Sequence, residues 1–482
     1  MISGVKTKLV GLPGPKLSRR RLLATTVGMA GLTLTSCTRS ASSPPAYELT
    51  LVAREQPLAA VQQLLARQVA EAADQRGVRL SIQSMLASDL RTKLGPAAAA
   101  KQLPDLALVG DFDFAALAAH GFLVNVRPVL QRIVGLNGEL FSPLGALVAA
   151  GPFEDLAPDA PDPAWAIPLS SRGSGLLVRQ DLLAPKNLLP PKTVDDARQA
   201  AQRLTDPTRQ IYGWGTPLPI ADATEHLLRV MLLAYGAPVF DSLGFRVTLD
   251  PAAAATALSA VASLYRDDRG MSLAPTGVVD LTAAQAIDLY IAGQVGQLFD
   301  PGGYYAQIVA RDATFRLNTI VVPLPSGPRG WFTATATDLL IASKAGQAPD
   351  VALSLVEAWL QPSAFAALAR AGAGAFVPPY AYATKDAFWD EDPNYAALAL
   401  NARGDPPHKI QYAGIGYPGP PTLVAAVVEA ALPFVDAARS VVRDGQAPVH
   451  VAATLYDRCL SLAQRALAGI SGGSDDAYSA NH

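Results

Sequence analysis

The segment over residues 165–183 constrains the fold most, because it contains two short apolar strands separated by a polar, glycine-containing stretch. The first strand is expected over 166–169 and the second over 175–179, with a helix beginning at Asp181. Pro168 lacks a backbone N–H, so the first strand belongs at a sheet edge or at a crossing between sheets. A segment of this kind is suited to act as a hinge.

The length and composition of the chain allow a large core divided among several units. The chain has 482 residues, of which 50% are hydrophobic, and such a length favours two or three domain-sized units. The formal net charge is -2, and six basic residues but no acidic ones lie in the first 36 positions. Without those six, 33 basic residues stand against 41 acidic ones. This acidic excess argues against a nucleic-acid partner, which would favour a basic surface.

Metal and cofactor motifs are not found in the sequence. The chain has five histidines, and none is spaced from another His or Cys in the manner of zinc ligands. We therefore expect neither a bound metal nor a cofactor.

The first 36 residues have the pattern of an export signal. Basic residues at 19–21 precede an uncharged apolar run over 22–34, which ends at Leu-Thr-Ser-Cys. This run is too short for a membrane span, which needs about 20 residues, so we expect its removal. The arginines resemble a twin-arginine signal and the last four residues resemble a lipobox, which would make Cys37 the lipid-bearing first residue. The alternative is an ordinary cleaved signal with an incidental Cys37.

The next part of the chain has a β-α-β pattern. A strand is expected over 47–52, an amphipathic helix over 58–76 and a second strand over 78–82. The two strands should be parallel, because a helical crossover joins them. A further buried strand over 103–109 precedes a helix that ends at 120–121.

Four charged residues follow the ends of these strands: Arg54, Glu55, Asp111 and Asp113. Ligands of open α/β sheets bind beyond the carboxyl ends of the strands, so this position predicts a cleft. For Asp111 and Asp113, helix capping or first-turn charge is the alternative.

Helices around one short strand are expected in the middle of the chain. A Thr cap should start a helix over 193–204, and an Asp-Pro pair should start another over 252–266. A helix is also expected over 225–235. The glycine-spaced segment 211–215 is interpreted as a strand that brings Trp214 near a loop end.

Two adjacent tyrosines, Tyr304 and Tyr305, follow a helix that ends at Gly293 and a strand expected over 295–299. Tyrosine combines an apolar ring that can stack on a ligand with a hydroxyl that can form hydrogen bonds. Neighbouring residues of a regular strand point to opposite sides, so only one of the pair could face a cleft.

The C-terminal part is expected to be mainly helical. Trp359 lies on an apolar helix face and should be core, whereas Trp389 lies in an acidic stretch and is interpreted as a surface anchor. Two terminal helices are expected over 423–443 and 449–467. Cys459 fits the apolar pattern of the second and is expected to be a packed thiol.

In this order, the features resemble the extracellular solute-binding proteins of ABC importers, in particular the carbohydrate-binding group related to maltose-binding protein. The resemblance runs from about 47 to 467 and rests on 165–183 as the first crossover between lobes and on the helix, strand and aromatic pair of 283–305. The segments 318–325 and 372–379 resemble the second and third crossovers. The chain departs from maltose-type members at 423–424, where they place a Trp, which puts maltodextrin itself in doubt.

The resemblance implies an α/β, two-lobed periplasmic-binding-protein fold in which each lobe is a mixed or parallel sheet flanked by helices. Its expected boundaries are a signal over 1–36, a tether over 37–46, lobe one over 47–165 plus 325–374, lobe two over 170–318 plus 378–470, hinges near 166–169, 319–325 and 374–379, and a tail over 471–482.

The resemblance also implies a function. The chain would be the extracytoplasmic component of an ABC importer, anchored through Cys37, monomeric and not an enzyme, which binds a sugar or polyol between its lobes and delivers it to a permease. Pro168 and its neighbours would form the hinge, and Trp331 is a further candidate for stacking. The expected ligand-binding residues are Arg54, Glu55, Asp111, Asp113, Ser170, Arg172, Trp214, Tyr304, Tyr305, Trp331 and Tyr417.

Three alternatives remain open at the level of sequence. Tyr304 and Tyr305 could ligate ferric ion, as adjacent tyrosines do in iron-binding relatives. Arg54 and Arg172 could hold the phosphate of a phosphorylated polyol. An exported glycan-acting enzyme could use a pair of carboxylates, although the sequence has neither a His-Glu-x-x-His motif nor a P-loop.

Overall fold

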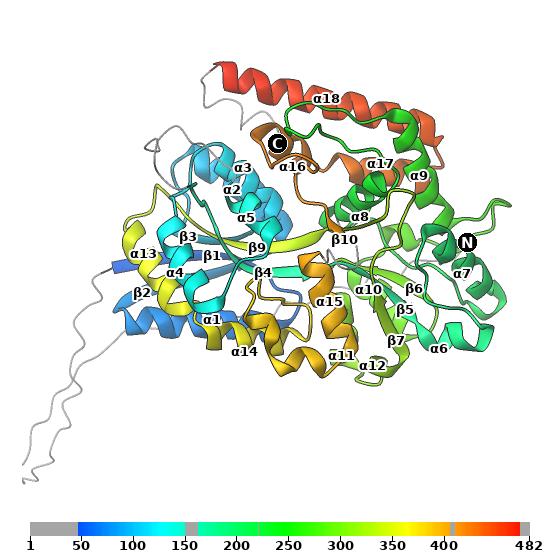
Figure 1. The fold of residues 1–482 in the computed structure, drawn as a ribbon, viewed down its shortest axis with the longest axis horizontal. Helices are drawn as coiled ribbons and strands as arrows, with labels where there is room; N and C mark the ends of the chain where they lie inside the picture. The colour runs from blue at the N-terminus through cyan, green and yellow to red at the C-terminus, as the bar shows by residue number, and fades with distance from the viewer. Residues whose placement is uncertain (1–46, 150–161, 220, 405–409, 473–482) are drawn as a thin grey trace, which may run out of the picture. The chain divides into compact units, whose positions relative to one another are not determined.

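The computed structural model describes residues 47–149, 162–219, 221–404 and 410–472 (Figure 1). The expected export signal and tether lie outside the described residues, as do Cys37 and most of the expected tail. Two larger sheets and a short β-ladder organise the described part, with helices packed around them.

The larger sheet has five strands in the order β2-β1-β3-β9-β4. β1 runs parallel to both β2 and β3, whereas β9 runs antiparallel to β3 and β4. The predicted parallel β-α-β unit is confirmed, since α1 joins β1 to β2. The bounds are β1 Tyr47–Arg54, α1 Ala59–Gln75, β2 Val78–Met85, β3 Leu106–Gly110, β4 Ile167–Gly173 and β9 Thr335–Ala342.

A three-stranded sheet has the order β6-β5-β7, with both outer strands antiparallel to β5. A separate parallel ladder joins β8 to β10. The bounds are β5 Gly175–Arg179, β6 Gln297–Asp300, β7 Thr319–Val322, β8 Trp331–Thr333 and β10 Ile410–Tyr412.

The chain passes from the larger to the smaller sheet through one residue, Ser174, between β4 and β5. The polar stretch that the sequence suggested as a turn is strand as far as Gly173, because its residues pair with β9. β4 is an edge strand, as Pro168 predicted, and its register shifts immediately after that proline.

Helices carry most of the remaining described chain. Those of the first part are α2 Ala87–Ala99, α3 Asp111–Ala119, α4 Arg127–Asn137 and α5 Ser142–Ala149. Those of the middle are α6 Gln180–Leu183, α7 Val194–Leu204, α8 Ala221–Ala234, α9 Pro251–Tyr265, α10 Ala283–Ile291, α11 Tyr304–Arg311 and α12 Phe315–Asn318. The last are α13 Pro349–Trp359, α14 Pro362–Gly372, α15 Pro393–Arg403, α16 Leu423–Ala430, α17 Pro433–Val442 and α18 Pro448–Gly472.

Local signals place several helix starts correctly. Thr193 forms a capping box with Asp196 at the start of α7, and Asp250 accepts from the amide of Ala252 before α9. Both satisfy amides that the helix itself leaves unpaired. Trp359 and Cys459 are buried in the core, as predicted.

Three expectations are wrong. The segment 211–215 makes only isolated bridges instead of a strand, because Gly213 lies so close to α7 that a Cβ there would be 2.1 Å from Cα of Ala201. The expected helix over 423–443 breaks into α16 and α17 at Pro433, which cannot continue a helix. Trp389 is core, because its ring packs on Phe388 and its Nε1 donates to a backbone carbonyl.

Across the described ranges, no single helix combines the length and apolarity that a membrane crossing requires. Only the pair α13 and α14, bent by 68°, meets that test of length and composition together.

Candidate functional site

A cavity of about 320 Å³ lies where the start of α3, helix α5 and the loop after β10 meet. Its volume is at the lower end of the range typical of small-molecule pockets, about 300–1,000 Å³. It contains two residues that the sequence predicted, Asp111 and Tyr417. The lining residues are Asp111, Ala146, Leu147, Tyr412, Gly414, Ile415, Tyr417, Gly419, Pro420 and Pro421.

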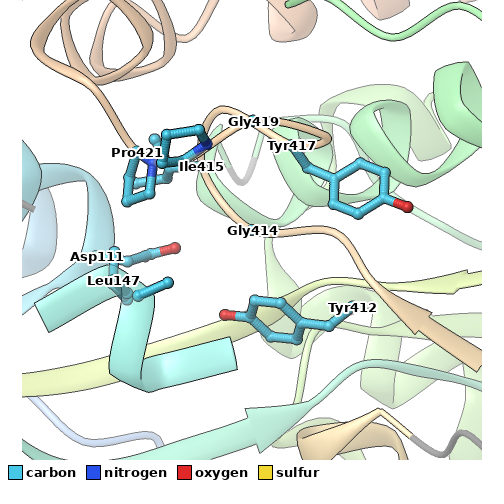
Figure 2. Close-up of a pocket in the computed structure, with 10 residues that line it drawn as sticks. Asp111, Leu147, Tyr412, Gly414, Ile415, Tyr417, Gly419 and Pro421 are labelled. Atoms are coloured by element: carbon cyan, nitrogen blue, oxygen red, sulfur yellow. The ribbon is translucent and has the colours of Figure 1, made fainter. Parts of the chain in front are cut away.

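Two polar groups face each other across this cavity. Asp111 opens α3 directly after β3 ends, and its carboxylate points toward the hydroxyl of Tyr412 (Figure 2). That hydroxyl accepts a hydrogen bond from Oγ1 of Thr335 at 3.1 Å. Burial and the charge of Asp111 raise the pKa of Tyr412. A neutral hydroxyl and a carboxylate together offer one donor and several acceptors to a polar ligand.

The other walls of the cavity are largely apolar. Leu147, Ile415 and Pro421 line it together with the ring of Tyr417, which packs edge-on against Phe332 with ring centroids 5.9 Å apart. The hydroxyl of Tyr417 points away from the cavity (Figure 2) and donates to Oε1 of Gln411 at 2.8 Å. Tyr417 therefore contributes a ring surface, not a polar group.

Buried polar residues of α8 lie behind Asp111, the acidic residue that lines the cavity. His226 is 1% exposed and stacks on Phe112, with ring centroids 5.4 Å apart. Its Nε2 is 3.7 Å from Oδ2 of Asp111. The guanidinium of Arg229 lies over the same Phe112 ring at 5.2 Å.

Helix α8 also supports the loop after β10, which forms one side of the cavity. Arg229 forms an ion pair with Glu429 of α16 and donates to the carbonyl of Ala413 at 3.4 Å. Glu429 in turn accepts from the amide of Gly416 at 2.9 Å. Burial raises the pKa of Glu429, opposed by the charge of Arg229. The loop that carries Tyr417 is thus fixed from α8 through α16.

The other predicted residues of the larger sheet lie at the expected strand ends but do not line the cavity. Arg54 ends β1, and its Nη1 is 2.8 Å from where a Cβ of Gly110 would stand. Asp113 forms an ion pair with Arg91 at 2.9 Å, which adds an interaction to its first-turn position. Glu55 is exposed and contributes its backbone amide to β2.

Ser170 and Arg172 serve the sheet. The hydroxyl of Ser170 donates to Asp338 at 2.7 Å, and the guanidinium of Arg172 donates to the other oxygen of the same carboxylate at 2.6 Å. All three side chains are buried. This polar cluster holds β4 to β9 immediately before the crossing at Ser174.

The predicted aromatic residues of the smaller sheet are core residues. Trp214 packs against Tyr265, and Tyr304 and Tyr305 open α11 inside a hydrophobic cluster. Tyr305 donates to Asp392 at 2.5 Å. Burial raises the pKa of both adjacent tyrosines. Neither tyrosine is among the residues that line the cavity, and both are carried by a helix instead of a strand end.

The remaining aromatic, Trp331, is half-buried in β8 and is not one of the residues that line the cavity. Among the residues that the structure describes, no group of three or more His, Cys, Asp or Glu side chains could hold a metal ion.

Sequence reasoning missed the supporting residues of the site. His226, Arg229 and Glu429 become neighbours of the cavity only when α8 and α16 pack together. A usable signal was present, since Glu225, His226 and Arg229 stand next to the apolar residues of α8, and all three are buried. Buried charges in a helix of this kind need partners from elsewhere in the fold.

Comparison with known proteins gives one family and one fold. Residues 67–397 match a family model described as "Bacterial extracellular solute-binding protein". A search of curated proteins finds no match.

Solved structures show the same fold at low sequence identity. An ABC transporter solute-binding protein from Thermotoga lettingae, bound with α-D-tagatose, has a TM-score of 0.68 at 16% identity and covers 87% of this chain and 100% of its own. The GacH receptor of Streptomyces glaucescens, solved unliganded and with acarbose, has a TM-score of 0.68 at 14% identity, with 86% and 98% covered. The sugar-binding protein MalE of Xanthomonas citri has a TM-score of 0.66 at 19% identity, with 87% and 98% covered.

Proposed function

Because this chain belongs to the bacterial extracellular solute-binding protein family, we propose that the cavity beside Asp111 and Tyr412 binds a sugar or related polyol. An ABC permease then receives the ligand from the closed protein. The family places the protein outside the cytoplasm. Closure of two lobes around the ligand would shift an equilibrium between open and closed forms.

The observation that carries the proposal is the lining of the cavity, one carboxylate and one tyrosine hydroxyl facing each other between apolar walls. A sugar has hydroxyl donors for Asp111 and a C–H face for the rings and aliphatic side chains. The known ligands of two neighbours of this fold, α-D-tagatose and acarbose, belong to this chemical class.

The two alternative ligands fit the site less well. No Lys or Arg is among the lining residues, and Arg172 is engaged by Asp338, so a phosphate would meet Asp111 without a counter-charge. The Tyr305 hydroxyl is bonded to Asp392 and Asn394 within the core, which opposes a role as an iron ligand.

The lobes of this proposal keep the expected boundaries, lobe one over 47–165 plus 325–374 and lobe two over 170–318 plus 378–470, except that β4 assigns 170–173 to lobe one. Sheet membership supports the division, because β1, β2 and β3 pair in one sheet and β5, β6 and β7 in the other. The first hinge is drawn at Ser174, where strand pairing changes from one sheet to the other. The export signal and a lipid anchor at Cys37 remain part of the proposal on the strength of the sequence pattern.

A thermal-shift screen tests the proposed function. Neutral mono- and oligosaccharides, including D-tagatose and acarbose, are compared with polyols, sugar phosphates and ferric citrate. A ligand that binds only the folded state raises the melting temperature, by an amount that grows with its concentration. A neutral sugar should give the largest rise. A rise with sugar phosphates or iron alone would contradict the proposal, and turnover of a glycan would indicate an enzyme.

Two conservative variants then locate the binding site. Asp111→Asn and Tyr412→Phe should each weaken sugar binding by about tenfold, because the first replaces a charged acceptor by a neutral amide and the second removes the hydroxyl. Tyr382→Phe is the control, since Tyr382 is exposed and lies outside the cavity. Isothermal titration calorimetry measures the affinities. Unchanged affinity in both cavity variants would place the site elsewhere.

A further inference from the structure

We propose that His226 is a positioning residue that holds the ligand-facing carboxylate of Asp111 in place. This inference rests on the proposed sugar site and adds a residue that orients its carboxylate. His226 touches no ligand itself; it acts through Asp111.

The first observation is an unsatisfied buried imidazole. Neither ring nitrogen of His226 has a hydrogen-bond partner among the described residues, and the side chain is 1% exposed. Buried polar groups of native proteins nearly always have a partner, so an orphaned one calls for an explanation.

The second observation is the group it faces. Nε2 of His226 is 3.7 Å from Oδ2 of Asp111, and a movement of about 0.5 Å would bring the two atoms into hydrogen-bonding range. Stacking on Phe112 fixes the plane of the imidazole. Asp111 lines the cavity, so the histidine can bond one carboxylate oxygen from behind while the other faces a ligand.

The third observation is the charge around His226. On its own helix, Glu225 and Arg229 are buried beside it, α16 contributes Glu429 and α3 contributes Asp111. Tyr412 faces Asp111 from β10. Glu429 is engaged by Arg229, and Glu225 accepts from amides of α17, whereas Asp111 lies close to the imidazole.

These observations give the expected effect on binding. A hydrogen bond from Nε2 of His226 would orient the carboxylate of Asp111, and a pre-oriented carboxylate loses less freedom when ligand binds. Loss of this hydrogen bond should therefore weaken binding by about tenfold.

A double-mutant cycle tests the link between the two residues. Titrations with D-tagatose and with acarbose compare wild type, His226→Gln, Asp111→Asn and the double variant. His226→Gln should weaken binding about tenfold, yet change nothing further in the Asp111→Asn background. Equal losses in both backgrounds, or no loss in either, would overturn the proposal. His450→Gln, at an exposed position of α18, is the control.

A ligand-free measurement separates this inference from the proposed function. The chain has five histidines, so their ring signals can be followed by NMR with labelled histidine, and the His226 signal is identified by its loss in His226→Gln. The chemical shift of that signal should differ between wild type and Asp111→Asn, whereas the His450 signal should not change. An identical chemical shift in both proteins refutes the contact even if a sugar binds. An altered chemical shift supports it even if neither sugar binds. Asp111→Asn keeps the shape of the side chain, so this arm does not depend on how well a His226 variant folds.

Discussion

At the scale of single residues, one carboxylate decides where the adjacent tyrosines lie. Asp300 ends β6, is fully buried, and accepts from the backbone amides of the next turn, including Gly302 at 2.7 Å and Tyr304 at 2.9 Å. It thereby caps α11 and directs Tyr304 and Tyr305 into the core instead of the cavity.

Replacement of Tyr304 tests this placement. Tyr304→Ala should destabilise the protein by about 3–5 kcal/mol, because it removes a large buried side chain from a packed cluster. Urea denaturation measures the loss. Leu317→Ala, at an exposed residue of α12, should cost less than about 0.5 kcal/mol. If the Tyr304 variant were as stable as wild type but bound no sugar, the ring would belong to the site after all.

At the scale of elements, α8 brings charges into the apolar interior and other helices supply their partners. Glu225 accepts from the amides of Phe434 and Val435 at 3.0 and 3.2 Å, which caps the start of α17. Burial raises the pKa of Glu225 well above its ordinary value of 4.5, and the nearby charge of Arg229 only partly offsets this.

The raised pKa predicts how stability depends on pH. The folded state holds the Glu225 proton more tightly than the unfolded state, so its contribution is present below pH 4.5 and is lost as the pH rises toward the folded pKa. Glu225→Gln keeps an acceptor for α17 without the buried charge. The difference between the melting temperatures, variant minus wild type, should therefore be larger at pH 8 than at pH 4.5. A difference that is equal at the two pH values would contradict this.

The sequence predicted elements well where the signal is local. The β1-α1-β2 unit, the cap at Thr193 and the edge position of Pro168 follow from periodicity, capping chemistry and a missing amide. It failed where distant packing decides, as with Trp389 and the segment 211–215. Of the residues that line the cavity, the sequence predicted only Asp111 and Tyr417, because the helices that support the cavity lie far apart in the chain.

At the scale of the whole molecule, the connection from β4 to β5 joins the two sheets through a very short segment. β4 ends at Gly173, and Ser174 alone separates it from β5. A Cβ at Gly173 would lie 2.2 Å from the carbonyl oxygen of Leu398 and 2.6 Å from the amide nitrogen of Ala402, both in α15. The sequence suggested a hinge at 166–169, but strand pairing continues to the place where α15 packs on the chain.

Gly173→Ala tests this contact. The methyl group of alanine would clash with the backbone of α15. The free energy of unfolding should therefore fall by about 1–3 kcal/mol. Gly135→Ala is the matched control, because nothing lies within 4 Å of its Cβ position and it is inside α4. Alanine there should stabilise by about 0.5–1 kcal/mol. Thermal melts of the two variants should move in opposite directions, and a neutral Gly173→Ala would show that α15 yields easily.

Helix α8 supports both Asp111 and the loop after β10. This shared support has a practical consequence. A redesign of this protein for another solute would have to change residues of α8 together with the residues that line the cavity. If only the residues that touch the ligand were exchanged, the new binding surface would still rest on a helix whose packing suits the original solute.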